Sequence, residues 1–218
     1  ERSRGLGDVY KRQCIGSPVG KCHHDKKEEY EQHLKYFDRM VELAHAFDTR
    51  VIRGFAFWKF GVAKGEANRP DIEEYVDIIA EKLEPIVKVA EKEDVTLSFE
   101  TEGSTMIGTC AEAKAVIDAL GNSPALSVCW DVKNGYSCGE MPYPDGYKHI
   151  KGLVTHFHVK PNKDRNMQTV GETELTYEKI FKIAIADGFD GSLSIEHWGS
   201  PELMLKGVRE LRNVVDQL

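Results

Sequence analysis

Four ionisable side chains recur at one kind of position in the chain, at or near the end of a short strand-like segment. They are Glu100 in VTLSFE, Asp131 in ALSVCWD, His158 in VTHFHVK and Glu196 in SLSIEHW. Three carboxylates that converge on one point repel each other strongly unless a cation neutralises them. One imidazole with three carboxylates suits Mn²⁺, Mg²⁺ or Co²⁺, and Zn²⁺ is also acceptable. The spacing therefore predicts a divalent-metal centre.

Side-chain alternation indicates how the strands would present these groups. In VTLSFE the three apolar residues share one face, and Thr96, Ser98 and Glu100 share the other. The other three segments also have an apolar face that can pack on helices and a more polar face with an ionisable residue. In a barrel the polar face points inward, and active sites are built at the carboxyl ends of the strands. A single acidic residue there is usually a helix cap or a loop salt bridge, but four in register favour a shared site.

Strand-like and helix-like segments alternate along the chain from Cys14 onward. We expect strands within 14–20, 51–58, 95–100, 125–131, 154–160 and 192–198. We expect helices near 25–47, 70–93, 111–120, 145–151, 176–186 and 201–218. Strict alternation with short turns predicts a parallel sheet covered by helices, either doubly wound or closed as a barrel. No Gly-rich phosphate loop follows an early strand, which disfavours the dinucleotide-binding version.

The composition narrows the classes of partner. The chain has 218 residues and a formal charge of -7, which disfavours binding to phosphate backbones and favours a small-molecule partner over nucleic acid. No apolar run approaches the roughly 20 residues that a membrane helix needs, and no secretory signal is visible. The five cysteines have irregular spacing without a CxxC motif, which is typical of reduced thiols in a cytoplasmic protein.

Six short motifs carry a resemblance to a known family. They are IGSPVGK (15–21), LSFETEG (97–103), VCWDVKN (128–134), THFHVKPN (155–162), VGE (170–172) and GFDGSLSIEHW (188–198). In order and spacing they resemble the sugar-phosphate isomerase/epimerase superfamily with the xylose-isomerase-like barrel. The resemblance implies a (β/α)8 TIM barrel with one catalytic divalent ion, held by Glu100, Asp131, His158 and Glu196. It also implies that Glu100 and Glu196 form the acid/base pair that exchanges a proton on the carbon next to a carbonyl.

Five further residues are candidates for substrate binding. Asn134 follows the aspartate by three residues, although it could also simply form a turn, and Lys160 shares the face of the strand-end histidine. Glu102 would face the same side of the strand as Glu100, two residues earlier, and is therefore the main alternative to Glu100 as a metal ligand. Trp58 would form an apolar wall for a sugar or cap the barrel. His197 alternates away from its acidic neighbour and is expected only to line the rim.

Other reactions are compatible with the same barrel. A keto-sugar or inositol-type lyase or dehydratase would begin with the same proton abstraction and then expel a hydroxyl group. An abasic-site endonuclease would need a three-zinc cluster with further histidines, where this chain has Asn134 and Asn166. A non-catalytic ligand-binding barrel is disfavoured by the intact ligand set. No Arg and Gly cluster marks a phosphate clamp, so a free sugar or polyol is the expected substrate; a homo-oligomer is left open.

The first 13 residues do not fit the barrel pattern. Six strand-like segments match the third to the eighth strand of an eight-stranded barrel, so residues 14–218 are expected to be a partial TIM-barrel catalytic domain. The stretch SRGLGDVYKRQ resembles one reading frame of a transposase-type sequencing adapter. We therefore expect residues 1–13 to be an artefact of library construction, attached to a fragment of metagenomic origin.

Overall fold

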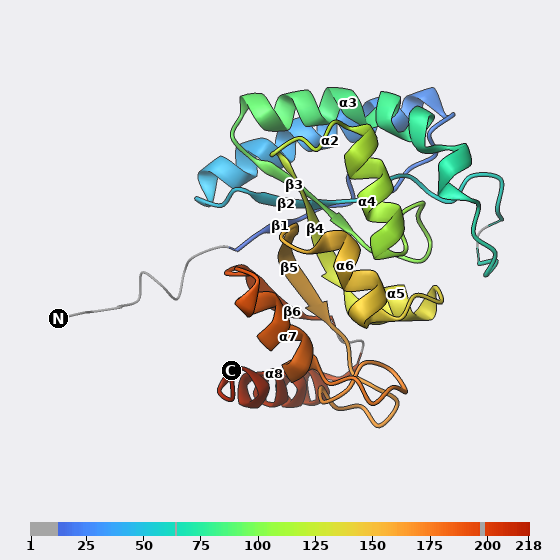
Figure 1. Cartoon of the computed structure of the whole chain (residues 1–218). Coiled ribbons are helices and arrows are strands. Elements are labelled where there is room, and N and C mark those ends of the chain that lie inside the picture. Colours follow the sequence, from blue (N-terminus) through green and yellow to red (C-terminus); the bar gives the residue numbers. More distant parts are fainter. Residues whose placement is uncertain (1–12, 64, 197–198) are drawn as a thin grey trace.

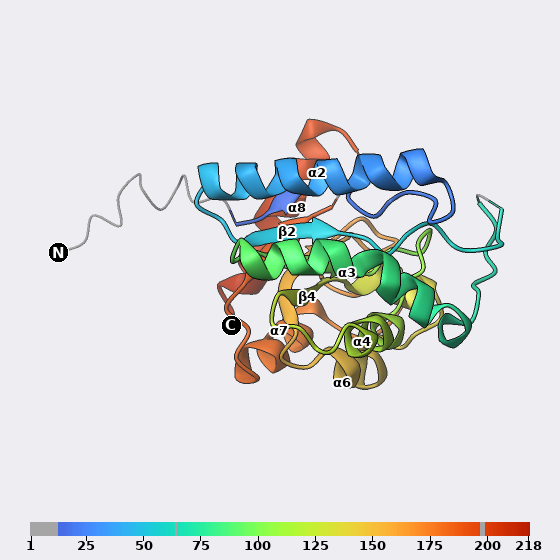
Figure 2. The same ribbon diagram turned by 90° about the horizontal axis from the view of Figure 1, so that it is seen from above.

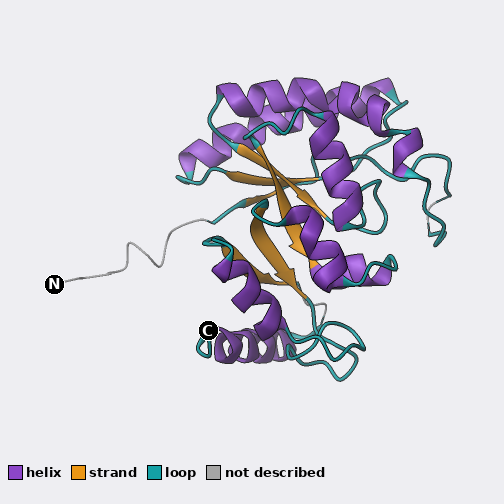
Figure 3. Ribbon diagram, in the orientation of Figure 1, coloured by secondary structure: helices purple, strands orange, loops and turns teal. Residues whose placement is uncertain are grey.

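The structure, a computed structural model, describes residues 13–63, 65–196 and 199–218. Within these ranges, six strands form one parallel sheet in chain order (Figures 1 and 3). They are β1 (Ile15–Gly16), β2 (Val51–Gly54), β3 (Thr96–Glu100), β4 (Leu126–Asp131), β5 (Val154–Val159) and β6 (Ser192–Ile195). The expected order and direction of the strands are confirmed. The numbering of these strands as the third to the eighth of a complete barrel stays a prediction.

Helices cover the outer face of the curled sheet, as the view from above shows (Figure 2). They are α2 (Lys27–Ala46), α3 (Val76–Lys92), α4 (Cys110–Ala119), α5 (Val132–Ser137), α6 (Tyr147–Ile150), α7 (Tyr177–Ala186) and α8 (Pro201–Val215). Two short helical turns, η1 (Ile72–Glu74) and η2 (Pro142–Gly146), lie between them. The fold is therefore α/β with a half-barrel of six strands. None of the helices in the described ranges is long and apolar enough to cross a membrane.

The helices form where the sequence has an apolar stripe and a capping residue. In α2 the buried residues Phe37, Val41 and Ala44 lie at helical spacing on the face toward the sheet. Thr109 begins α4 with a capping box, in which the Thr109 hydroxyl accepts from the backbone N–H of Glu112 and the Glu112 carboxylate accepts from that of Thr109. These helices fix the strands from outside and leave the inner face of the sheet for polar groups.

The helix after β4 was not predicted from the sequence. The segment VKNGYS forms α5 directly after the strand because the Asp131 carboxylate accepts a hydrogen bond from the backbone N–H of Asn134 at 2.9 Å. The helix expected near 145–151 is present as η2 followed by α6. The α5 turn brings Asn134 back over the carboxyl end of the sheet.

A β-bulge interrupts the alternation of side chains in β5. Val128 of β4 pairs with Val154 and the next residue, Cys129, pairs with His156, so Thr155 is the extra residue. The Thr155 hydroxyl lies 2.8 Å from the Ser127 hydroxyl, within a buried polar cluster on the inner face. Simple alternation would place Thr155 on the apolar face, and the bulge is the reason that it does not lie there.

Most of the leader, residues 1–12, lies outside the described residues. Its assignment as a library artefact therefore stays a prediction. Gln13 is described, and its side-chain oxygen accepts a hydrogen bond from the Ser192 hydroxyl of β6 at 2.8 Å.

Candidate metal centre

The four strand-end residues lie together at the carboxyl end of the sheet. Glu100, Asp131, His158 and Glu196 each offer one ligand atom, and these atoms all lie within 4.8 Å of one another. They come from β3, β4, β5 and the residue after β6, and Asp131 is in direct register with His158. Glu100 and Asp131 are almost completely buried, with 1% and 0% of their surface exposed. Such charges are costly to bury without a compensating cation.

The imidazole of His158 lies between the two glutamates. Its Nδ1 is 3.2 Å from Glu100 Oε1 and 3.2 Å from Glu196 Oε2. Burial alone would lower the pKa of His158, but hydrogen bonds to Cys129, Glu100 and Glu196 outweigh burial and raise it to about 12. Without an ion, the ring is therefore protonated and supplies part of the missing positive charge.

Lys160 supplies a second positive charge, from the residue that follows β5. Its Nζ lies 2.8 Å from Asp131 Oδ2, 3.4 Å from Glu196 Oε2 and 2.8 Å from Asn134 Oδ1. The Tyr177 hydroxyl of α7 donates a hydrogen bond to the backbone carbonyl of Lys160, which fixes the start of the loop after β5. Asn134 thus contacts the predicted centre through the ammonium group and does not only form a turn.

The charge balance changes the pKa of each carboxylate. Burial raises the pKa of Asp131 to about 6, although Lys160 opposes this effect. The hydrogen bond from His158, with help from Lys160, lowers the pKa of Glu196 to about 2 despite partial burial. Burial would also raise the pKa of Glu100, but His158 and Arg53 hold it below its ordinary value. At neutral pH all three carboxylates are therefore ionised.

Two carboxylate oxygens of this cluster lack a well-formed hydrogen bond among the described residues. Asp131 Oδ2 and Glu196 Oε2 are buried, and Lys160 Nζ lies 2.8 Å from the first and 3.4 Å from the second. Buried polar atoms without a partner are uncommon and call for an explanation, such as an ion or a water molecule. Oxygen and imidazole donors with unused lone pairs are what Mn²⁺ and Mg²⁺ require. The residues present therefore fit a divalent ion.

Arg53 of β2 belongs to the same cluster, although it was not among the residues predicted from the sequence. Its Nη1 lies 2.5 Å from Glu100 Oε2, and its guanidinium lies over the ring of Phe55 at 4.8 Å. The inner face of β2 carries it, in register with Ser98 of β3. The sequence offered one sign of this role, which is the position of Arg53 on the inner face of the strand. Val51 and Gly54 are not polar, so the strand shows no alternating polar pattern.

The remaining predicted residues lie farther out on the rim. The Glu102 carboxylate lies 3.4 Å from Lys21 Nζ and accepts a hydrogen bond from the Ser104 hydroxyl at 3.0 Å. The structure therefore does not group Glu102 with the four candidate ligands. Trp58 lines a cavity of about 510 Å³ together with Lys59 and residues of the two neighbouring loops. His197 lies outside the described residues, so its role at the rim stays a prediction.

This arrangement has the parts needed for proton transfer on a small molecule. Glu100 and Glu196 are two carboxylates within reach of one bound ligand, and an ion between them would polarise a carbonyl group of that ligand. A lysine ammonium and an asparagine amide at the same edge can hold hydroxyl groups.

Several solved structures share this fold. A D-tagatose 3-epimerase-like protein matches with a TM-score of 0.75 and 15% identity, over 97% of this chain and 80% of that one. A probable 3-DHS dehydratase from Bacillus anthracis matches with a TM-score of 0.72 and 15% identity, over 95% and 77% of the two chains. A Mycobacterium smegmatis protein in complex with magnesium matches with a TM-score of 0.69 and 20% identity, over 96% and 74%. Identities this low show the shared fold alone.

The sequence itself matches a family model along nearly its whole length. The model is described as the xylose isomerase-like TIM barrel, and the match covers residues 9–214. The four strand-end residues, Arg53 and Lys160 all lie within this range. The chain belongs to the family of xylose isomerase-like TIM barrels.

Proposed function

We propose that the chain is a divalent-metal-dependent sugar isomerase or epimerase that moves a proton on a carbon next to a carbonyl group. The observation that carries this proposal is the pair of glutamates, Glu100 and Glu196, that meet at one imidazole nitrogen of His158. Two carboxylates at one small site can remove and return a proton on the same substrate. Solved structures with the same fold include an epimerase-like protein, which supports this class of reaction.

In this proposal Glu100, Asp131, His158 and Glu196 hold the ion. Mn²⁺ or Mg²⁺ suits the oxygen-rich set best, and Co²⁺ or Zn²⁺ is the alternative. When bound, the ion polarises the substrate carbonyl and stabilises the negative charge that develops on its oxygen.

Glu196 is the better candidate for the first proton removal. Both oxygens of Glu100 have partners, His158 for one and Arg53 for the other, and its side chain is only 2% exposed. The Glu196 side chain is 28% exposed, so a ligand can reach it more easily than it can reach Glu100. Glu100, which is ionised at rest, takes up a proton from solvent and returns it to the substrate, and Glu196 gives the abstracted proton to solvent before the next turnover. Return to the same carbon gives epimerisation, and return to the neighbouring carbon gives aldose–ketose isomerisation.

The substrate in this proposal is a free sugar or polyol. Lys160 and Asn134 lie beside the carboxylates and can bind its hydroxyl groups, and Trp58 supplies an apolar wall on the rim cavity. The charge of -7 opposes a nucleic-acid partner. We place the protein in the cytoplasm because its five cysteines are all free. Assembly into a homo-oligomer is left open.

Solvent deuterium exchange tests this function. Incubation of the metal-loaded protein with a panel of ketoses in D2O should place deuterium on the carbon next to the carbonyl. Glu196→Gln should slow this exchange by roughly 100-fold or more, because an amide cannot accept the proton. Glu178→Gln, on the outer helix α7, is the matched control and should exchange normally. Exchange at the wild-type rate in the Glu196 variant would refute the assignment.

A dehydratase is the second candidate, and the position of Lys160 favours it. Its ammonium lies among the carboxylates and could donate a proton to a leaving hydroxyl group. Loss of water from the ketose in the same incubation would support this reaction, and deuterium exchange without loss of water would support the isomerase or epimerase.

A further inference from the structure

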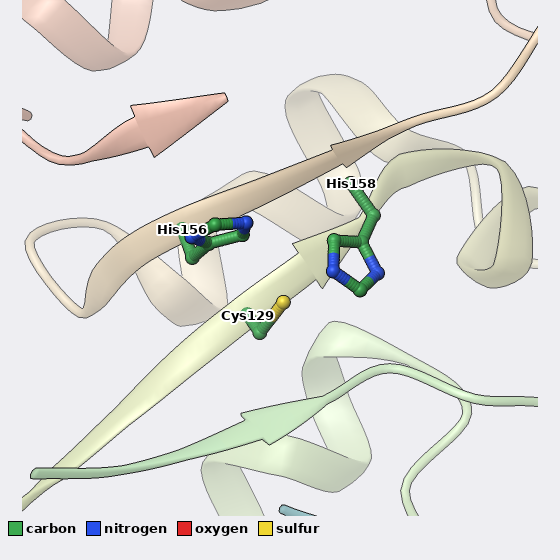
Figure 4. A group of neighbouring side chains, drawn as sticks. All are labelled: Cys129, His156 and His158. Carbon is green, nitrogen blue, oxygen red and sulfur yellow. The ribbon is translucent and has the colours of Figure 1, made fainter. Parts of the chain in front are cut away.

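A second cluster of side chains with potential ligand atoms lies on β4 and β5. Cys129, His156 and His158 each offer one ligand atom, and these atoms lie within 4.8 Å of one another. Figure 4 shows the three side chains gathered on the inner face, one from β4 and two from β5. Cys129 and His156 take no part in the proton transfer proposed above.

The β-bulge in β5 creates this cluster. It places His156 directly opposite Cys129, in the position that Thr155 would take in an unbroken register. His158 lies two residues farther along the same face, with its ring centroid 5.3 Å from that of His156. The three donors are thus held by the backbone of two paired strands.

The side chains of this cluster are shielded from solvent, and a hydrogen bond fixes one of the two histidine rings. Cys129 is 0% exposed and His156 is 3% exposed. The Ser194 hydroxyl of β6 contacts His156 Nε2 at 2.8 Å, which leaves Nδ1 as the other ring nitrogen. A hydrogen bond that fixes one imidazole nitrogen while the other binds an ion is the usual arrangement around metal-ligating histidines.

His158 can serve this cluster through its second ring nitrogen. Nδ1 faces Glu100 and Glu196, which leaves Nε2 for the side of the sheet interior. Figure 4 shows one ring nitrogen of His158 turned toward the Cys129 sulfur. One imidazole therefore separates an oxygen-rich set of donors from a set that contains sulfur.

We propose that Cys129, His156 and His158 form a second metal site, selective for thiophilic ions such as Zn²⁺. Thiolate and imidazole donors favour Zn²⁺ and Co²⁺ and disfavour Mg²⁺ and Mn²⁺. Three protein ligands leave one tetrahedral position open. Binding forms a metal–sulfur bond to Cys129 and a metal–nitrogen bond to His158 Nε2, and it releases the thiol proton and the Nε2 proton to solvent. This site shares His158 with the oxygen-rich centre through the other ring nitrogen, whereas Cys129 and His156 take no part in the proposed reaction, so a failure of the isomerase assignment leaves the test of this site unaffected.

Cobalt binding gives a direct optical test. Full-length Glu196→Gln, in which the oxygen-rich centre is weakened, should develop a near-ultraviolet sulfur-to-cobalt charge-transfer band on addition of Co²⁺. The double variant Glu196→Gln/Cys129→Ser should lack this band. Cys22→Ser in the same background is the matched control, because Cys22 is also 0% exposed, and it should keep the band. Cobalt binding without the band, or a band that survives loss of Cys129, would overturn the proposal.

A second measurement does not depend on the folding of the cysteine variant. X-ray absorption of the Glu196→Gln protein loaded with one equivalent of Zn²⁺ should show one sulfur neighbour at about 2.3 Å. A shell that contains only nitrogen and oxygen would contradict the site. His156→Gln in the same background should weaken Zn²⁺ binding at least tenfold, as expected for the loss of one ligand.

Discussion

Binding of a divalent ion to the oxygen-rich centre should release protons, and the structure indicates how many. The pKa of His158 is raised to about 12 by hydrogen bonds that outweigh its burial, so the metal-free ring carries a proton on the nitrogen that faces the carboxylates. An ion can bind this imidazole only after the proton leaves. We therefore expect release of about one proton per ion between pH 7 and 9.

The same reasoning gives the slope of affinity against pH. The apparent dissociation constant for Mn²⁺ should fall about tenfold per pH unit in this range, which corresponds to about 1.36 kcal/mol. The pKa of Asp131 is raised to about 6, so below this pH a second proton must also leave and the slope should steepen. The raised pKa of His158 contributes stability to the metal-free fold that is fully present below pH 6.5, decreases progressively above it and is gone at about pH 12. Metal binding thus competes with a proton that the fold retains at neutral pH.

Calorimetry measures the proton count directly. Mn²⁺ titrations at one pH in several buffers that do not bind the ion give a binding enthalpy that varies with the ionisation enthalpy of the buffer. The slope of that line is the number of protons released and should be close to one. His149→Gln, on the outer helix α6, is the control and should leave the slope unchanged. A slope of zero for the wild type would refute the proposal that His158 is protonated in the metal-free protein and loses this proton when it binds the ion.

Three further substitutions test other parts of the cluster and its support. Lys160→Met should raise Mn²⁺ affinity about tenfold or more at pH 8, because it removes a cation beside the ligands; calorimetry that shows weaker binding would contradict this. Arg53→Met should raise the pH at which Glu100 takes up a proton by about one pH unit, because Glu100 loses a partner that lowers its pKa; an unchanged midpoint in an NMR titration of the Glu100 carboxyl carbon would argue against it. Arg69→Ala should lower the free energy of unfolding by about 2–3 kcal/mol in urea titrations, since it breaks a partly buried ion pair at 2.7 Å and hydrogen bonds to three backbone carbonyls, and the exposed Arg212→Ala should cost far less. Equal losses in the two variants would show that the partly buried pair is not stabilising.

The periodicity of the sequence was sufficient for the framework of the fold. Each strand has one apolar face, and the strands alternate with amphipathic helices, so the number of strands, their parallel direction and their order could all be predicted. Glu100, Asp131 and His158 share the inner-face parity at strand ends, and this placed them at one edge of the sheet. Pattern and topology act together here, because parallel strands bring all their carboxyl ends to the same side.

The features that were missed depend on backbone geometry that no residue pattern encodes. Arg53 contacts Glu100 because the register of β2 and β3 sets it opposite Ser98, one position diagonally from Glu100 on the same face, and the sequence does not give this register. The bulge at Thr155 changes which residue of β5 faces Cys129, and a strict period of two cannot predict such an insertion. The turn of α5 carries Asn134 back to Lys160, a contact that spacing in the chain does not reveal.

Metal analysis after equilibrium dialysis tests the central claim most directly. Full-length wild type dialysed against Mn²⁺ should retain about one ion per chain, since Mn²⁺ prefers the oxygen-rich donors over the thiolate cluster. Asp131→Asn should retain almost none, because the orphaned buried oxygen that would bind the ion is lost, and Glu178→Gln should retain the wild-type amount. Equal Mn²⁺ content in the wild type and Asp131→Asn would contradict the assignment of this cluster as the metal centre.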